Sequence, residues 1–292
     1  MATVTTGEGG LQKVSLTAGS DGSSGAGAAT AEVYRHGATL TGWSVGGQQL
    51  IFVSPKAVFQ PPKAIRGGVP VCFPQFGNLG PLQAQHGFAR NREWQLASSS
   101  SSSATFALES DEQTLALWPH AFRAELTVSL QPSGALQQVL RVTNTDGKPL
   151  EFTCALHTYF KVSDIANVAV VGLKGLQYFD NAAGALATDE AEAVTFQGEV
   201  DRAYLGAPDT LKVTDSGRDA VLMVHKRGFR DAVVWNPAEA KATGMADLGE
   251  HWRGFVCLEV AQARSGPVVL QPREAWEGST TVEYDTVGEG AD

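Results

Sequence analysis

Two ionisable residues stand inside strongly apolar segments of the chain, and their types could perform acid–base chemistry. His157 lies in EFTCALHTYF, and Glu259 lies in FVCLEVAQ. If both segments are strands, alternation places His157 on the same face as Ala155 and Tyr159, and Glu259 on the same face as Cys257. An ionisable group inside an apolar strand needs either a partner or a chemical role. A hydrogen-bonded structural group is the alternative for each.

Two arginines flank the apolar, glycine-broken segment GGVPVCFPQFG. Arg66 directly precedes it, and Arg90 follows in QHGFARNREW. Guanidinium groups suit phosphate and carboxylate oxygens, and neighbouring glycines let a ligand approach the backbone closely. The pattern therefore predicts an anion site. The alternative is that each arginine caps a loop or pairs with an acid such as Glu93.

Three other motifs carry weaker signals. VVWNP ends a predicted strand at Trp235, whose ring could stack on a sugar or fill the core. HKRGFR, residues 225–230, lies between two predicted strands and is expected to be a solvated turn. GWSVG, residues 42–46, matches the nucleophile pattern of serine hydrolases, which needs a helix after the serine. Ser44 precedes a predicted turn and strand instead, so we expect no nucleophile there.

Short β-strands must position these residues. Runs of β-branched and aromatic residues alternate with Gly, Pro, Asn and Asp, whereas long helical periodicity is missing. The pattern predicts an all-β antiparallel sandwich or barrel, with its site in end loops or on a concave sheet face. The predicted strand segments are 31–45, 48–54, 104–110, 124–130, 136–144, 150–162, 169–173, 211–215, 220–225, 232–236, 255–261, 267–272 and 279–287.

Length and charge limit the domain organisation and the partners. No linker divides the 292 residues, so we expect one domain over 1–292, with 1–30 partly flexible and 285–292 a tail. The low-complexity segments 19–30 and 98–103 are expected to be turns or surface loops. A net charge of −9 argues against nucleic acid, which calls for a basic face. A few arginines can still bind a small anion.

The cysteines and the first residues indicate the compartment. Cys72, Cys154 and Cys257 lie in separate apolar runs, which is typical of buried free thiols, and no zinc-ligand spacing occurs. We therefore expect no metal site. We find no pattern of a signal peptide or of a membrane span, and we expect no membrane partner. These features favour the cytoplasm, and a plastid destination stays open.

Seven separated segments resemble the glucose-6-phosphate 1-epimerases, the hexose-6-phosphate mutarotases of the aldose 1-epimerase superfamily. The resemblance extends from about Val33 to about Glu283, and it implies a galactose-mutarotase-like β-supersandwich with a sugar lying across a concave sheet face. The segments are IRGGVPVCFPQFG, QHGFARNREW, LHTYFKVSD, DRAY, VVWNP, KATGMADLGE and FVCLEV.

The resemblance also implies roles for individual residues. His157 matches the general acid of the family, and Glu259 matches its general base. These two groups would open and close the sugar ring without a metal or redox cofactor. The implied substrate contacts, to which we add Trp235, are Arg66 and Arg90 for the phosphate, Gln85 and Asp201 for the sugar, and His86 for a ring hydroxyl.

The expected activity is that of an isomerase. It would interconvert the α and β anomers of hexose 6-phosphates, glucose 6-phosphate above all, as a monomer. A glycoside hydrolase is one alternative, but it needs two carboxylates that face each other across the bond. A sugar-phosphate-binding sandwich without catalytic activity is the other alternative, and only His157 and Glu259 speak against it.

Overall fold

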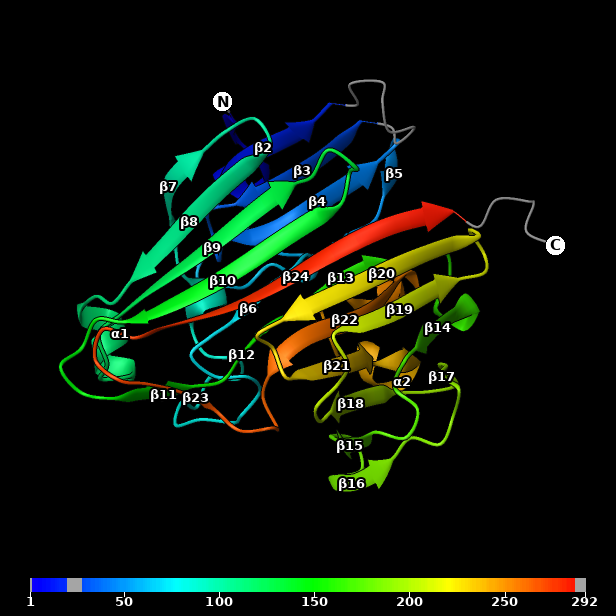
Figure 1. The fold of residues 1–292 in the computed structure, drawn as a ribbon. Helices are drawn as coiled ribbons and strands as arrows, with labels where there is room; N and C mark the ends of the chain where they lie inside the picture. The colour runs from blue at the N-terminus through cyan, green and yellow to red at the C-terminus, as the bar shows by residue number, and fades with distance from the viewer. Residues whose placement is uncertain (1, 20–27, 287–292) are drawn as a thin grey trace.

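The computed structural model describes residues 2–19 and 28–286, and antiparallel β-sheet dominates it (Figure 1). Every pairing between named strands in these ranges is antiparallel. Short helices appear only in connections. The predicted all-β antiparallel class is therefore confirmed.

Four sheets make up the fold, and their strands follow here in spatial order. The five-stranded sheet contains β1 (Thr3–Thr6), β2 (Gln12–Ala18), β3 (Ala29–Tyr34), β4 (Thr39–Val45) and β5 (Gln48–Gln49). The nine-stranded sheet contains β17 (Ala193–Val194), β14 (Val168–Val171), β19 (Thr210–Asp215), β20 (Ala220–Arg227), β24 (Ala275–Thr286), β10 (Leu136–Asn144), β9 (Phe122–Leu130), β8 (Ser103–Glu109) and β7 (Gln95–Ser99).

The third sheet carries the residues of interest. This eight-stranded sheet contains β16 (Ala185–Thr188), β15 (Gln177–Asp180), β18 (Val200–Tyr204), β21 (Asp231–Asn236), β22 (Phe255–Gln262), β12 (Cys154–Leu156) and β6 (Val71–Cys72), with β13 (Tyr159–Lys161) paired to β22 as well. A small sheet pairs β11 (Leu150–Phe152) with β23 (Val268–Leu270). The helices are α1 (Glu112–Leu117) and α2 (Ala238–Ala242), and 3-10 turns span Glu8–Gly10, Ala89–Asn91, Ile165–Asn167 and Gly249–Gly254.

The main core fills the space between the sheets. Val256, Leu258 and Val260 of β22 belong to it, together with Val14 of the five-stranded sheet and Leu126 of the nine-stranded sheet. Because successive side chains of a strand point to opposite faces, the residues between them turn away from this core. Glu259 is one of these residues. The eight-stranded sheet thus has the core on one face and free space for a site on the other.

Strand register then brings distant residues into one row. Asp201 of β18 pairs with Trp235 of β21, and Trp235 pairs with Cys257 of β22. Cys257 in turn pairs with Tyr159 of β13. One row across four strands therefore collects residues that lie far apart in the sequence.

The predicted strand 150–162 is instead three short strands, and the breaks serve the site. β12 ends at Leu156, opposite Val260, and β13 begins at Tyr159, opposite Cys257. His157 falls between them, where its backbone N–H donates to the carbonyl oxygen of Pro70 at 3.0 Å. The break leaves His157 beside the middle of β22.

The structure tests the predictions for the serine run 98–103 and for the motif around Ser44. The serine run 98–103 forms the end of β7, the hairpin connection 100–102 and the first residue of β8, and Ser100 Oγ accepts from the backbone N–H groups of Ser102 and Ser103. Ser44 lies in β4, which continues through a turn to β5, so no helix follows the serine. Both outcomes match the sequence predictions, and the serine-hydrolase pattern has no structural support.

The opening segment is more ordered than its composition indicates. Residues 3–6 and 12–18 form β1 and β2. Residues 29 and 30 belong to β3, and residues 285 and 286 of the predicted tail belong to β24. Residues 1, 20–27 and 287–292 lie outside the described residues. One buried cluster includes residues from β2 to β24, which supports our proposal of a single domain. Among the described residues, no helix combines the length and the apolar character needed to cross a membrane.

Candidate active site

One cavity of about 480 Å³ is lined by all the residues that the sequence analysis predicts for the site. The cavity lies on the face of the eight-stranded sheet that turns away from the main core. The predicted residues that line it are Arg66, Gln85, His86, Arg90, His157, Asp201, Trp235 and Glu259.

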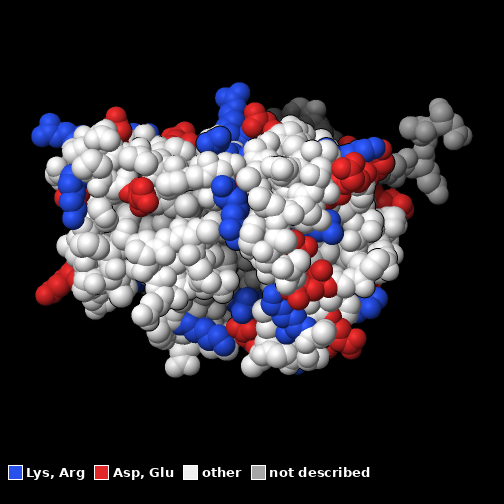
Figure 2. Space-filling view, turned by 90° about the horizontal axis from the view of Figure 1, so that it is seen from below, with Lys and Arg blue, Asp and Glu red and all other residues white. Residues whose placement is uncertain are grey.

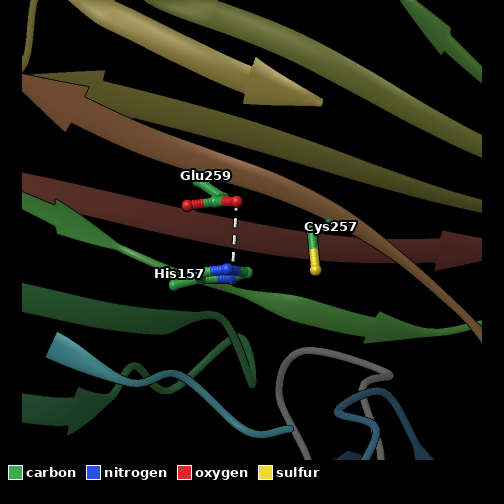
Figure 3. A group of neighbouring side chains, drawn as sticks. All are labelled: His157, Cys257 and Glu259. Atoms are coloured by element: carbon green, nitrogen blue, oxygen red, sulfur yellow. Dashed lines mark ion pairs between the residues drawn. The ribbon is translucent and has the colours of Figure 1, made fainter. Parts of the chain in front are cut away.

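His157 and Glu259 form the centre of the site. The imidazole Nδ1 lies 3.4 Å from the Glu259 carboxylate Oε1 (Figure 3), and the Glu259 side chain is only 1% exposed. His157 Nδ1 and the other carboxylate oxygen, Oε2, are buried without a hydrogen-bond partner in the described structure. Buried polar atoms are rarely left unpaired. The site thus holds two reactive groups whose hydrogen bonds are incomplete.

Burial shifts the pKa values of this pair in opposite directions. It raises the pKa of Glu259 well above its usual value, and Asp201 adds to this effect. Burial also lowers the pKa of His157 well below its usual value, and the nearby His86, Arg90 and Arg66 add to the shift. Both shifts favour the uncharged forms. The surroundings of the free site therefore disfavour the charged form of both groups.

Aromatic rings hold His157 in place. Its ring stacks on Tyr159, with centroids 4.8 Å apart and planes 11° from parallel. Trp235 meets the imidazole edge-on at 5.8 Å, and His86 meets it at 5.5 Å. Trp235 is 8% exposed and also packs on Phe255, so it both lines the cavity and fills a small apolar cluster. Trp235 thus fills an apolar cluster, as one interpretation of the sequence expects, while its stacking on a sugar stays a prediction.

His86 occupies an unusual backbone conformation at the edge of the site. Its φ of 64° lies in the left-handed region, which a residue with a side chain rarely adopts. The backbone N–H of Gly77 donates to His86 Nδ1 at 3.1 Å, so Nε2 carries the proton of the neutral ring. Burial, helped by Arg90 and Arg66, lowers the pKa of His86 to about 3. This imidazole is a neutral donor at physiological pH.

Arg66 already has a partner in the described structure. Its Nε donates to Asp247 Oδ1 at 3.1 Å, and its Nη1 donates to the Tyr159 hydroxyl at 3.4 Å. Burial alone would lower the pKa of Arg66, but Tyr159 and Asp247 raise it. Lys63 Nζ lies 3.3 Å from the other Asp247 oxygen. The guanidinium of Arg66 therefore stays charged, and Asp247 and Tyr159 hold its Nε and Nη1 in place.

The glycines after Arg66 serve packing rather than ligand approach. Gly67 and Gly68 have φ values of 108° and 72°, and a Cβ atom on them would lie 2.5 Å from the carbonyl oxygen of Phe52 and 2.3 Å from that of Leu40, respectively. Only glycine fits such contacts. The space that the sequence interpretation left for a ligand is filled by backbone.

Arg90 and Gln85 lie together at the rim. Arg90 Nη2 donates to the backbone oxygen of Gln85 at 2.9 Å, while Arg90 Nε is buried without a partner in the described structure. The ion pair with Glu93 that we considered as an alternative is not formed: Glu93 pairs with Arg35. Arg90 is thus free to meet an anion in the cavity.

Four more polar residues near the cavity were not singled out from the sequence. Arg264 stacks its guanidinium on the Phe179 ring at 3.6 Å and donates to Asn181 Oδ1 at 3.0 Å. Asn181 Nδ2 donates to Asp201 at 2.7 Å, and Lys241 Nζ lies 3.9 Å from the same carboxylate. Lys241 and the Arg66 partner Asp247 both lie in KATGMADLGE, a recognised segment, whereas the sequence around Arg264 gave no signal.

The cavity is more basic than the protein as a whole. Four cationic side chains and two carboxyl groups line it, in a chain whose net charge is −9. Viewed from below, the molecule is hollowed near its centre, and basic and acidic side chains lie around the hollow (Figure 2). Focused positive charge attracts anionic ligands even to an acidic protein.

The comparisons with known proteins agree with this geometry. The family model "Aldose 1-epimerase" matches residues 23–283. A protein from Cenchrus ciliaris named "Putative glucose-6-phosphate 1-epimerase" is 42% identical over 92% of this chain and 83% of its own length. An Escherichia coli protein of the same name is 33% identical over 82% of each chain.

Solved structures give the same assignment. A "putative mutarotase" from Salmonella typhimurium superimposes with a TM-score of 0.84 at 28% identity, over 94% of this chain and 91% of its own. A galactose mutarotase-like protein from Lactobacillus casei, 18% identical, shares the fold with a TM-score of 0.71 over 88% of this chain and 97% of its own. The predicted mutarotase-like fold and epimerase class are confirmed, and the chain belongs to the aldose 1-epimerase family.

Proposed function

We propose that this protein interconverts the α and β anomers of hexose 6-phosphates, with glucose 6-phosphate as the preferred substrate. One observation carries the proposal: the His157–Glu259 pair lies in the same cavity as Arg66 and Arg90. The pair supplies an acid and a base for a hemiacetal, and the arginines supply a site for a phosphate. The names of the relatives point to the same substrate.

The reaction needs two proton transfers at the anomeric centre. Glu259 accepts the proton of the O1 hydroxyl while His157 donates a proton to the ring oxygen O5, and the C1–O5 bond breaks. The open-chain aldehyde then turns about C1–C2, and closure reverses both transfers. His157 Nδ1 is buried against Glu259, so we assign the transfer to Nε2. Each transfer from a positioned group accelerates a reaction about 10²–10⁴-fold.

The proton count of the pair fits this cycle. An ionised Glu259 with a protonated His157 carries the same total number of protons as a neutral carboxylic acid with a neutral imidazole. Burial favours the neutral arrangement in the free site. This arrangement is also the one that ring opening leaves behind. The two forms that the mechanism requires are thus linked without any exchange of protons with water.

The phosphate would help to charge His157. Arg90 and Arg66 both lower the pKa of His157 in the free site, after the larger effect of burial. A phosphate dianion bound to these guanidinium groups offsets their positive charge, which raises the pKa of His157 in the complex. Substrates with a 6-phosphate would therefore gain both affinity and a better acid.

Exchange spectroscopy tests the proposal directly. Saturation-transfer NMR on glucose 6-phosphate measures the rate of α–β exchange, and we expect the protein to increase it at catalytic concentration. Binding without faster exchange would identify a sugar-phosphate-binding protein instead. Free glucose serves as the matched substrate without a phosphate, and it should be exchanged less efficiently, because two guanidinium groups then stay unpaired.

We also propose that the protein acts in the cytoplasm as a monomer, without a nucleic-acid or membrane partner. The acidic net charge supports the first exclusion, because nucleic-acid surfaces require basic ones. Size-exclusion chromatography with light scattering measures the oligomeric state, and a stable dimer would contradict the proposal.

A further inference from the structure

Three metal-ligand side chains meet where His157 and Glu259 of the cavity lie beside Cys257. One ligand atom each from His157, Cys257 and Glu259 lies within 4.8 Å of the others, and all three residues are buried (Figure 3). Cys257 and Glu259 alternate on β22, and the strand break at His157 places the imidazole beside them. The fold therefore gathers donors that the cysteine spacing did not reveal.

The separations suit a tetrahedral zinc ion. Zinc binds nitrogen and oxygen at about 2.0–2.2 Å and sulfur at about 2.3 Å, so ligand atoms around it lie about 3.3–3.8 Å apart. His157 Nδ1 and Glu259 Oε1 are already 3.4 Å apart. The third atom lies within 4.8 Å, so a shift of about 1 Å completes the arrangement.

The unpaired atoms point to a ligand at this place. His157 Nδ1 and Glu259 Oε2 are buried without hydrogen-bond partners in the part of the chain described. The Glu259 side chain is 1% exposed, and Cys257 is fully buried. A mixed nitrogen, oxygen and sulfur set favours zinc over magnesium or calcium, which prefer oxygen alone.

We propose that Zn²⁺ binds reversibly between His157, Cys257 and Glu259 and inhibits the enzyme by occupying its acid and its base. The inhibition rests on the proposed function, whereas the binding does not. Binding is a ligand exchange without a redox step: zinc replaces bound water with nitrogen, oxygen and sulfur, and the thiol proton of Cys257 and any proton on the Glu259 carboxyl pass to the solvent. The fourth position of the ion stays open for water, as in zinc sites with three protein ligands.

Calorimetry with Zn²⁺ tests the binding. We expect one zinc ion per chain for the wild type, and an affinity lower by more than about 100-fold in Cys257→Ala, because even changes in groups that only support the ligands cost 10- to 100-fold. Cys154→Ala is the matched control, because this buried thiol lies in the main core instead. It should bind zinc like the wild type. Equal zinc affinity in Cys257→Ala would overturn the proposal.

Exchange assays and a cobalt spectrum complete the test. Zinc should slow anomer exchange by the wild type and by Cys154→Ala, and a chelator should restore the exchange rate. Cys257→Ala should catalyse exchange without zinc and should keep that rate when zinc is added. If the wild type shows no exchange activity, the proposed function fails while calorimetry still decides the site. If Cys257→Ala does not fold, Co²⁺ added to the wild type decides: a thiolate-to-cobalt absorption supports the site, and its absence contradicts it.

Discussion

The two faces of β22 are equally buried but differ in what surrounds them. Leu258 and Glu259 are adjacent, and each is 1% exposed. Leu258 lies in the main apolar core, whereas Glu259 faces a cavity that leaves one of its oxygens unpaired. Burial alone therefore does not distinguish a structural residue from a functional residue in this sheet. Unpaired hydrogen-bonding atoms make that distinction.

The largest effect on activity is expected from a substitution on the cavity face of β22. Glu259→Gln keeps the size of the side chain but removes the base, so kcat for anomer exchange should fall by about 10²–10⁴-fold. Exchange NMR at saturating glucose 6-phosphate measures this fall, and circular dichroism checks the fold. A kcat within a few-fold of the wild-type value would remove Glu259 from the mechanism.

The neighbouring residue should show the opposite behaviour. Leu258→Ala deletes apolar contacts in the core and should lower the free energy of unfolding by about 2–5 kcal/mol. Urea denaturation measures that loss. The folded variant should keep a kcat close to that of the wild type, because the cavity face of β22 is unchanged. A large fall in kcat at full folding would show that the two faces are not separable.

A substitution at the rim of the cavity should change KM more than kcat. Arg66→Ala removes charge-assisted hydrogen bonds worth about 1.5–3 kcal/mol, which corresponds to an increase in KM for glucose 6-phosphate of about 10- to 100-fold. Lys63 remains as a partner for Asp247, so the local structure should hold. Kinetics with free glucose provide the control. Equal losses on both sugars would contradict a phosphate contact.

The smallest effect concerns stability and its pH dependence. Burial raises the pKa of Glu259 in the folded state, so the folded state holds this proton after the unfolded chain has lost it. The contribution to stability is complete below the unfolded pKa and is lost as the pH rises towards the folded value. Glu259→Gln should therefore match the wild type near pH 4 and exceed it in unfolding free energy by about 1–3 kcal/mol near pH 8. Denaturation at both pH values tests this, and a constant difference would contradict it.

The sequence predicted the alternation of β22 correctly, whereas the single strand predicted over 150–162 is broken at His157. Apolar residues at every second position identify a core face, and Val256 and Leu258 obey this rule. The residues assigned by resemblance, from Arg66 to Glu259, all line one cavity. Their roles stay predictions, because a lining position does not demonstrate a contact with substrate.

Other features could not be predicted, for identifiable reasons. Arg264 lines the cavity because its guanidinium lies on Phe179, a contact between the turn after β22 and strand β15 that sequence spacing does not encode. The break at His157 depends on a hydrogen bond to Pro70, and not on a local turn signal. The opening strands β1 and β2 lie next to a low-complexity segment that obscures them. In each case tertiary contacts overrode the local pattern.

The row of residues across β18, β21, β22 and β13 has a consequence for biosynthesis. Because its members are distant in the chain, a ribosome must release almost the entire polypeptide before the hollow exists. Folds with such high contact order form slowly. A sugar phosphate cannot template folding of the nascent chain; it can only stabilise the finished protein, by an amount that grows with its concentration. Ligand should therefore slow unfolding while leaving the refolding rate unchanged.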